Sequence, residues 1–227
     1  MAEPTKPLRL AILMVGRIYN YKDSYPNIME NIVQGNIADF FLSYSPELNE
    51  DLEDFRRIFQ PKILNNDPHV IKEINQAYQH QNRANVIKMF YNRQRILNDF
   101  KKYMADNNIT YDLIISYRVD TIAFEKLDYT MFKELDTNTI YIPCDFDWSG
   151  IGTCDQMAFG NLSVMEKYMS IYNDIDRYLG VQGTRIHGEE LVYRCLAMNG
   201  IQTVRFKLKH RLARPYGWNW PLDEPYH

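Results

Sequence analysis

The sequence predicts an α/β protein in which a mostly parallel central sheet lies between two layers of helices. The first observation is a set of short apolar runs, of which residues 8–15 are the clearest, that stop at a glycine or polar residue as buried parallel strands do. The second is that these runs alternate with segments of helical periodicity, which is typical of a three-layer sandwich. The 227 residues contain no internal repeat, low-complexity tract or linker, so we expect one domain.

Each strand is predicted from a short run of apolar residues bounded by turn signals. Residues 112–117 form the strongest run, and residues 203–208 alternate between apolar and polar as a half-exposed strand does. The predicted strands, in order, are residues 8–15, 38–43, 61–64, 112–117, 139–143 and 203–208.

The helices are predicted from apolar residues at three-to-four spacing and from start signals. Pro26 suits the first turn of a helix that begins near Ser24, and the longest pattern covers about residues 82–106. Residues 145–161 have little periodicity and are expected to form a loop that carries function, and the tail from residue 210 is expected to be irregular. The predicted helices are about residues 24–34, part of 46–59, about 82–106, 162–179 and 188–198.

Composition excludes several classes of protein. The apolar share of 45%, with 14% aromatic residues, can build a core and excludes intrinsic disorder. The 26 basic and 29 acidic residues leave a net charge of -3, so we expect no nucleic-acid partner. Three cysteines without a CxxC pair predict reduced thiols and a cytoplasmic protein. No run approaches the roughly 20 apolar residues of a membrane span, and no secretory signal is visible.

Ligands of open α/β sheets bind beyond the carboxyl ends of the strands, and two strand ends carry suitable residues. Gly16 and Arg17 follow the first strand, and Arg118 and Asp120 follow the strand of residues 112–117. Alternation places Arg118 and Asp120 on one face. A carboxylate there could hold Mg²⁺ or Mn²⁺, which would bridge two phosphate oxygens, or the two side chains could form an ordinary surface ion pair.

Two further acidic motifs allow more than one interpretation. Asp145 and Asp147 form the one strict Asp-x-Asp of the chain and could serve an aspartyl-phosphate type of phosphohydrolase, or lie in a solvated acidic loop. Glu189 and Glu190 begin a predicted helix after His187. They could simply interact with the helix dipole, or one of them could act as a general base.

Basic and amide residues supply candidate anion and metal contacts. His210 could be a metal ligand and Arg214 a phosphate clamp, although a single histidine is more often just hydrogen-bonded. Asn85, at the start of the long helix, could bind an anion or cap the helix. Among the 17 tyrosines, Tyr19 and Tyr21 follow the first strand, where the ring of either one could stack on a base.

Several segments together resemble glycosyltransferases of the GT-A type, which have a Rossmann-like fold. Residues 111–120 resemble the strand that ends in the metal-binding DXD motif of that family, except that Arg118 replaces the first Asp and only Asp120 is kept. Of this family, the sequence is most similar to the domain with which large algal viruses, the chloroviruses, build a capsid glycan. The other segments that carry the resemblance are residues 12–17, 38–44, 59–62, 85–91, 155–160 and 187–191.

The resemblance implies a metal-dependent transfer of a sugar, rhamnose or glucose in the viral case, from a UDP-sugar to a glycan or glycoprotein. It implies a nucleotide-binding half of about residues 1–120 and an acceptor-binding half of about 121–227. A carbohydrate-binding module without catalysis remains an alternative. The implied catalytic residues are Asp155 and Glu189, the nucleotide-sugar contacts Gly16, Arg17, Tyr19, Asn85, Arg118 and Arg214, and the ligands of Mn²⁺ or Mg²⁺ Asp120 and His210.

Overall fold

The computed structural model describes residues 6–18, 20–44, 52–74, 83–132, 135–145, 147 and 152–213. The strands are β1 Arg9–Val15, β2 Ile37–Ser43, β3 Ile63–Asn65, β4 Leu113–Arg118, β5 Thr121–Ala123, β6 Thr139–Pro143, β7 Met157–Gly160, β8 Gln202–Phe206 and β9 His210–Leu212. The α-helices are α1 Tyr21–Asn27, α2 Leu52–Phe59, α3 Arg83–Asn107, α4 Leu162–Met169, α5 Ile175–Leu179 and α6 Gly188–Met198. A π-helical segment at Ile28–Val33 continues α1, and a short 3-10 helix covers Tyr129–Phe132.

Seven of these strands form one sheet in the order β3-β2-β1-β4-β7-β6-β8, and β5 pairs with β9 in a separate ribbon. The pairs β3–β2, β2–β1, β1–β4 and β6–β8 are parallel, and β7 is antiparallel to both of its neighbours. The other strands of this sheet therefore all point the same way. The prediction of an α/β fold with a mostly parallel central sheet is confirmed.

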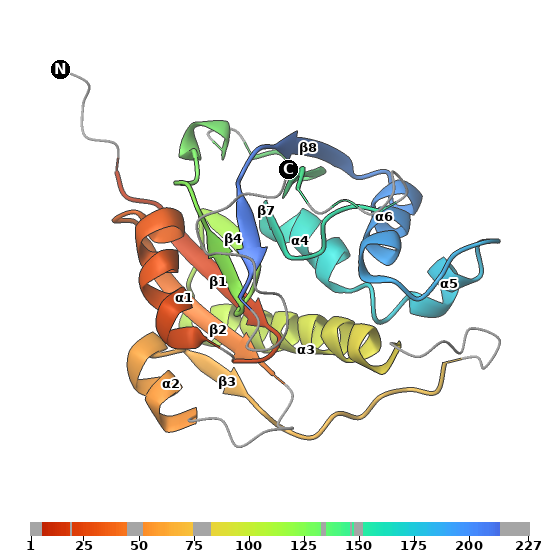
Figure 1. Ribbon diagram of the computed structural model, residues 1–227, viewed down its shortest axis with the longest axis horizontal. Coiled ribbons are helices and arrows are strands. Elements are labelled where there is room, and N and C mark those ends of the chain that lie inside the picture. Colours follow the sequence, from red (N-terminus) through yellow and green to blue (C-terminus); the bar gives the residue numbers. More distant parts are fainter. Residues whose placement is uncertain are drawn as a thin grey trace.

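Alternate residues of β1 pack into two separate clusters of buried side chains, one on each face of the sheet. Leu10, Ile12 and Met14 pack with residues of α1, the π-helical segment and α2, whereas Leu13 and Val15 pack with residues of α3, α4 and α6. All five are 0% exposed, as expected of a central strand with both faces covered. Figure 1 shows α1 and α2 on one side of the strands and α3, α4 and α6 on the other.

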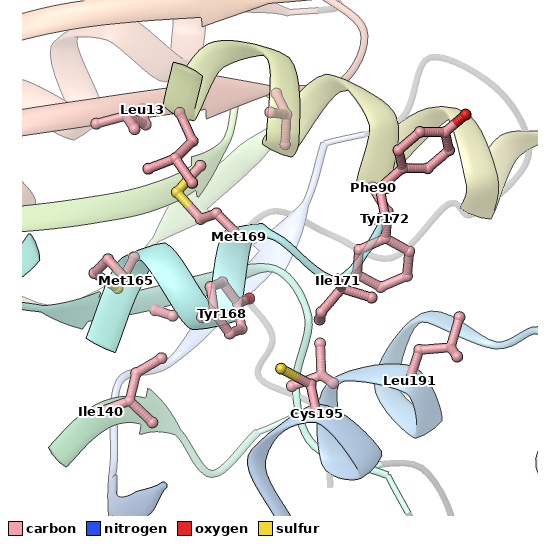
Figure 2. Close-up of a cluster of buried hydrophobic side chains, with 14 of the residues drawn as sticks. Leu13, Phe90, Ile140, Met165, Tyr168, Met169, Ile171, Tyr172, Leu191 and Cys195 are labelled. Carbon is pink, nitrogen blue, oxygen red and sulfur yellow. The ribbon is translucent and has the colours of Figure 1, made fainter. Parts of the chain in front are cut away.

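The second layer is held together by aromatic and aliphatic side chains from distant parts of the chain. Figure 2 shows Met165, Tyr168 and Met169 of α4 in the same cluster as Leu191 and Cys195 of α6. These five side chains are 0% exposed. Helices α4 and α6 of the second half of the chain thereby pack onto the sheet that the first half begins.

Among the described residues, no helix is long and apolar enough to cross a membrane.

Two predictions about the second half of the chain are wrong. Strand β7 lies inside the segment that we expected to be a loop. Its four residues are all buried between β4 and β6, so it shows neither alternation nor the length of a strand signal. The single helix predicted for residues 162–179 is two helices, because the turn formers Ser170, Asn173 and Asp174 separate α4 from α5, with Asn173 N–H donating to Ser170 O at 3.0 Å.

Smaller differences concern the ends of elements. The first helix begins at Tyr21 rather than near Ser24, so Pro26 lies inside it instead of in its first turn. Residues 210–212, which we expected to be irregular, pair with residues 121–123, for which no element was predicted, and the two form the β5–β9 ribbon. This ribbon is too short to show the periodicity on which the prediction depends.

Substitution of Phe41 by Ala should destabilise the fold strongly. The ring is 0% exposed, and its centroid lies 4.9 Å from that of Phe100 and 5.4 Å from that of Tyr103. We expect Phe41→Ala to lower the free energy of unfolding by about 3–5 kcal/mol in urea denaturation. Val70→Ala, at a residue that is 80% exposed, is the control and should change it by less than about 0.5 kcal/mol. Equal losses in both variants would contradict this packing.

Candidate functional site

The order of the strands makes the carboxyl ends of β1 and β4 a topological switch point, where open α/β sheets have their ligand-binding crevice. From β1 the chain passes to β2 and β3 on one side, and then crosses through α3 to β4 on the other side of β1. This reversal of strand order is the point at which open α/β sheets bind ligands. In the ladder, Val15 at the end of β1 is paired with Arg118 at the end of β4, so the residues that follow both strands meet there.

The chain leaves β1 through a glycine in a conformation that other residues rarely adopt. Gly16 has a φ of 109°, and a Cβ built on it would meet no atom of the described residues within 4 Å. The space beside its backbone is therefore open, as a close approach of a ligand to the main chain requires. Arg17 follows and is exposed. Both residues were predicted to lie at this edge, and in the structure they do.

Arg118 and Asp120 form a forked ion pair at the end of β4. Arg118 Nε donates to Asp120 Oδ1 at 3.1 Å, and Arg118 Nη2 donates to Oδ2 at 3.0 Å. The side chains are 19% and 5% exposed, so this is a largely buried pair and not the ordinary surface pair that the sequence left open. Two parallel hydrogen bonds of this kind fix the geometry of both groups.

The reversed direction of β7 brings Asp155 to the same place. Because β7 is antiparallel to β4, it starts at the edge where β4 ends, with Tyr117 opposite Met157 and the Arg118 N–H donating to Gln156 O at 3.1 Å. Asp155 precedes this strand and is only 7% exposed. The predicted catalytic residue Asp155 therefore lies beside the end of β4, although the strand that carries it was not predicted.

The start of α6 closes the site from the other side. A Cβ built on Gly188 would lie 2.1 Å from Asp155 Oδ2 and 3.4 Å from Met89 Cε of α3, so only glycine lets α6 approach this closely. Glu189 follows in the first turn, and its Oε2 lies 2.8 Å from His187 Nδ1. Its side chain is 21% exposed and can be reached from solvent. Glu190 instead is buried and contacts Arg185 Nε at 3.3 Å.

Electrostatic interactions join these residues into one cluster. Burial of the Arg118 guanidinium favours its neutral form, but the charges of Asp120 and Asp155 outweigh burial and raise the pKa of Arg118 above its usual range. Burial raises the pKa of Glu189, and the charge of Asp155 adds to this increase, while Arg118 opposes it. The predicted residues Arg118, Asp120, Asp155 and Glu189 therefore act on one another in the fold.

Arg93 of α3 belongs to this site and was not predicted. It is 0% exposed, and its Nη2 donates to the backbone oxygen of Asp155, while its Nε and Nη1 have no partner among the described residues. Its guanidinium carbon lies 5.3 Å from the ring centroids of Phe90 and Tyr168, a cation–π arrangement. The sequence held a signal for it, because Arg93 lies on the apolar stripe that also contains Phe90, Leu97 and Phe100.

Each of the two predicted metal ligands has other partners in the fold. The Ala213 N–H donates to the Asp120 backbone oxygen, whereas His210 lies opposite Ala123, three residues further along the ribbon. His210 is buried, with Nδ1 at 2.7 Å from Leu208 O and Nε2 at 3.8 Å from Cys154 Sγ, and burial lowers the pKa of its ring. Across the described ranges, no three His, Cys, Asp or Glu side chains are grouped to hold a metal ion.

The donor set around Asp120 therefore does not fit a divalent cation. Both of its carboxylate oxygens already accept hydrogen bonds from Arg118, and a cation beside that guanidinium would meet a like charge. The expected Mn²⁺ or Mg²⁺ stays a prediction from the resemblance.

The remaining candidates are divided between the site and other places. Asn85 is exposed in the first turn of α3, one turn before Met89, whose side chain faces Gly188. Tyr19 and Arg214 lie outside the described residues. Asp147 is used structurally, since its Oδ1 accepts from Arg205 Nη2 at 2.6 Å and from the Cys154 N–H at 2.9 Å.

Comparison with known proteins gives similarity at the level of structure. No family model matches the chain, and neither does any curated protein sequence. Its structure is similar to the apo form of the glycosyltransferase GlyE of Streptococcus pneumoniae TIGR4, with 14% identity, a TM-score of 0.47, and coverage of 88% of this chain and 45% of that one. It is also similar to a protein of Desulfovibrio desulfuricans G20 assigned as a nucleotide-diphospho-sugar transferase, with 11% identity, a TM-score of 0.44, and coverage of 89% and 80%.

The chain thus spans less than half the length of the first of these proteins.

Substitution of Gly188 by Ala tests the contact between α6 and Asp155. The new methyl group would overlap the carboxylate, so we expect Gly188→Ala to lower the free energy of unfolding by about 1–3 kcal/mol. In an Asp155→Ala background the overlapping atoms are absent, and the same substitution should cost much less. Urea denaturation of the four proteins measures this coupling. If Gly188→Ala lowers the free energy of unfolding equally in both backgrounds, α6 does not pack against Asp155 at this position.

Glu189 should make stability depend on pH in a defined direction. Because burial and Asp155 raise its pKa above the ordinary 4.5, its contribution to stability is full below that value and is lost as the pH rises through the folded-state pKa. Glu189→Gln stays neutral throughout. We expect the stability of the wild type relative to Glu189→Gln to fall over this pH window and then level off, as measured by urea denaturation at stepped pH. A rise over the same window would contradict the assignment.

Proposed function

We propose that the protein is a glycosyltransferase that moves a sugar from a nucleoside-diphosphate sugar, UDP-linked by resemblance, to a hydroxyl group of a glycan or glycoprotein. The observation that carries the proposal is the meeting of Arg118, Asp120, Asp155 and Glu189 beyond the carboxyl ends of β1 and β4. Such a crevice suits a nucleotide, and an anion-binding guanidinium beside carboxylates suits the transfer of a group from a phosphate to a hydroxyl.

The nucleotide side of the site lies at the end of β1. The open space beside Gly16 lets a nucleotide approach the main chain, and Arg17 follows it. Arg118, paired in register with Val15, lies next to this opening and would contact the diphosphate. Tyr19, Asn85 and Arg214 complete the proposed contacts to the base, the ribose or the phosphates.

The acceptor side of the site lies at the start of α6, where Glu189 would act as the general base. Its side chain is reachable from solvent, and a raised pKa makes a carboxylate a better proton acceptor. The acceptor oxygen attacks the anomeric carbon, and its proton passes to Glu189. The bond between that carbon and the phosphate oxygen breaks, and the nucleoside diphosphate leaves with the bonding electrons. This chemistry inverts the configuration of the sugar.

Asp155 would support this step rather than take the proton. It is almost fully buried, its backbone is held by Arg93, and its carboxylate faces both Gly188 and the field of Arg118. From there it can stabilise positive charge that develops on the sugar ring in the transition state. The identity of the sugar, the role of a metal ion and a viral capsid acceptor remain predictions from the resemblance.

Removal of the proposed base should abolish transfer and spare nucleotide binding. The donor is first identified by a hydrolysis screen of UDP-, GDP- and dTDP-sugars with and without Mn²⁺. We then expect Glu189→Gln to lower the turnover of that donor by about 100-fold or more, while the affinity for the free nucleoside diphosphate is kept in calorimetry. Glu166→Gln is the matched control, because Glu166 pairs with Lys101 between α4 and α3, away from the crevice.

Three outcomes would contradict the proposal. If no donor is bound or hydrolysed, a nucleotide sugar is not the substrate of this protein. Glycan binding that needs no nucleotide would favour the carbohydrate-binding module. Turnover of p-nitrophenyl phosphate that is lost in Asp145→Asn would favour the phosphohydrolase.

A further inference from the structure

A nucleoside diphosphate brings two to three negative charges, and the site must supply positive charge to hold it. The proposed nucleotide site, on which this inference rests, lies in a chain of net charge -3 without a basic field. A bound divalent cation commonly supplies this charge, but the donor atoms around Asp120 do not fit a divalent cation. The positive charge must therefore come from the side chains of the crevice.

The Arg118 guanidinium occupies the place next to Asp120 that a cation would take. It uses Nε and Nη2 to bind the two oxygens of Asp120, at 3.1 and 3.0 Å. Within the described residues its Nη1 makes no hydrogen bond, and the side chain keeps 19% of its surface exposed. One edge of the guanidinium is thus fixed by a carboxylate, and another remains able to donate to a phosphate oxygen.

The available edge belongs to a residue at the opening of the crevice. Arg118 pairs in register with Val15, the Val119 N–H donates to Val15 O at 3.2 Å, and Gly16 comes next with open space beside it. A diphosphate that passes along the main chain at Gly16 therefore comes within reach of Arg118. Asp120 does not have to release the guanidinium for this contact to form.

A second arginine offsets the carboxylates that would otherwise repel the ligand. Asp120, Asp155 and Glu189 bring three negative charges when all are ionised, against one from Arg118. Arg93 lies buried behind Asp155 with its charge unpaired by any carboxylate among the described residues. Arg93 and Arg118 together bring two positive charges against these three, so the cluster is less negative than its carboxylates alone would make it.

We propose that Arg118 is the built-in cation of the diphosphate site and that the protein binds nucleoside diphosphates without a divalent metal ion. The fork to Asp120 holds the guanidinium in place, so little side-chain entropy is lost when the ligand binds. Arg93 acts behind Asp155 as a positioning residue that balances the charge of the cluster.

Calorimetry with UDP and GDP as probes tests this directly. The wild type should bind the same nucleotide with the same affinity in excess EDTA and in millimolar Mn²⁺. Arg118→Gln, which removes the charge and keeps most of the volume, should weaken binding by roughly 10- to 100-fold in either buffer. Arg118→Lys keeps the charge and loses the fork, so its affinity should fall between the two. Arg177→Gln, at an exposed arginine of α5, is the matched control and should bind as the wild type does.

The thermal unfolding temperature of each variant establishes that it is folded. Should Arg118→Gln fail to fold, Arg118→Lys and the comparison of EDTA with Mn²⁺ in the wild type still decide the inference. Either of two results would overturn the inference: a tenfold or larger gain in affinity on adding Mn²⁺, or an unchanged affinity in folded Arg118→Gln. Both results would leave the proposed glycosyltransferase function standing. Absence of nucleotide binding in every buffer would instead remove the proposed function itself.

Discussion

The buried ion pair of Arg118 and Asp120 is the interaction on which the rest of the site depends. Removing one partner of such a pair leaves an uncompensated charge and costs about 3–5 kcal/mol, so each side chain holds the other in place. The backbone of Asp120 is fixed as well, because its oxygen accepts a hydrogen bond from the Ala213 N–H at 2.7 Å, next to the β5–β9 ribbon. The guanidinium that we assign to the diphosphate is therefore fixed before any ligand arrives.

The reversal of β7 explains how acidic residues from the second half of the chain reach this pair. Had β7 run parallel to β4, its start would lie at the opposite edge of the sheet, and Asp155 with it. Because it runs antiparallel, Asp155 enters the sheet where β4 ends, and the segment before it is held against α6 by a bond from the Thr153 N–H to Glu189 O at 3.0 Å. One reversed strand thus joins the nucleotide side of the crevice to the acceptor side.

The sequence predicted the parts of the fold whose signal is local, and it missed those that depend on partners far along the chain. Strands β1, β2, β4 and β6 are buried on both faces and read as continuous apolar runs, so their positions were predicted to within one or two residues. Strand β7 forms because its four residues pair with β4 and β6, and these four residues alone carry no strand signal. The same holds for the site: Arg118 and Asp120 were found from one strand end, whereas the role of Arg93 appears only when α3 is packed behind Asp155.

The two arginines of the site explain how a protein of negative net charge could attract a diphosphate. A protein with a net charge of -3 has no general attraction for a diphosphate, so the attraction must be built at one point. Two arginines from different elements bracket the acidic cluster, Arg118 at the opening and Arg93 in the interior, and each is held by an oxygen atom of the acidic residues themselves. The Asp120 carboxylate therefore holds the positive charge of Arg118 in place for the donor. The carboxylate of Glu189, which is reachable from solvent, remains available to take the proton of the acceptor.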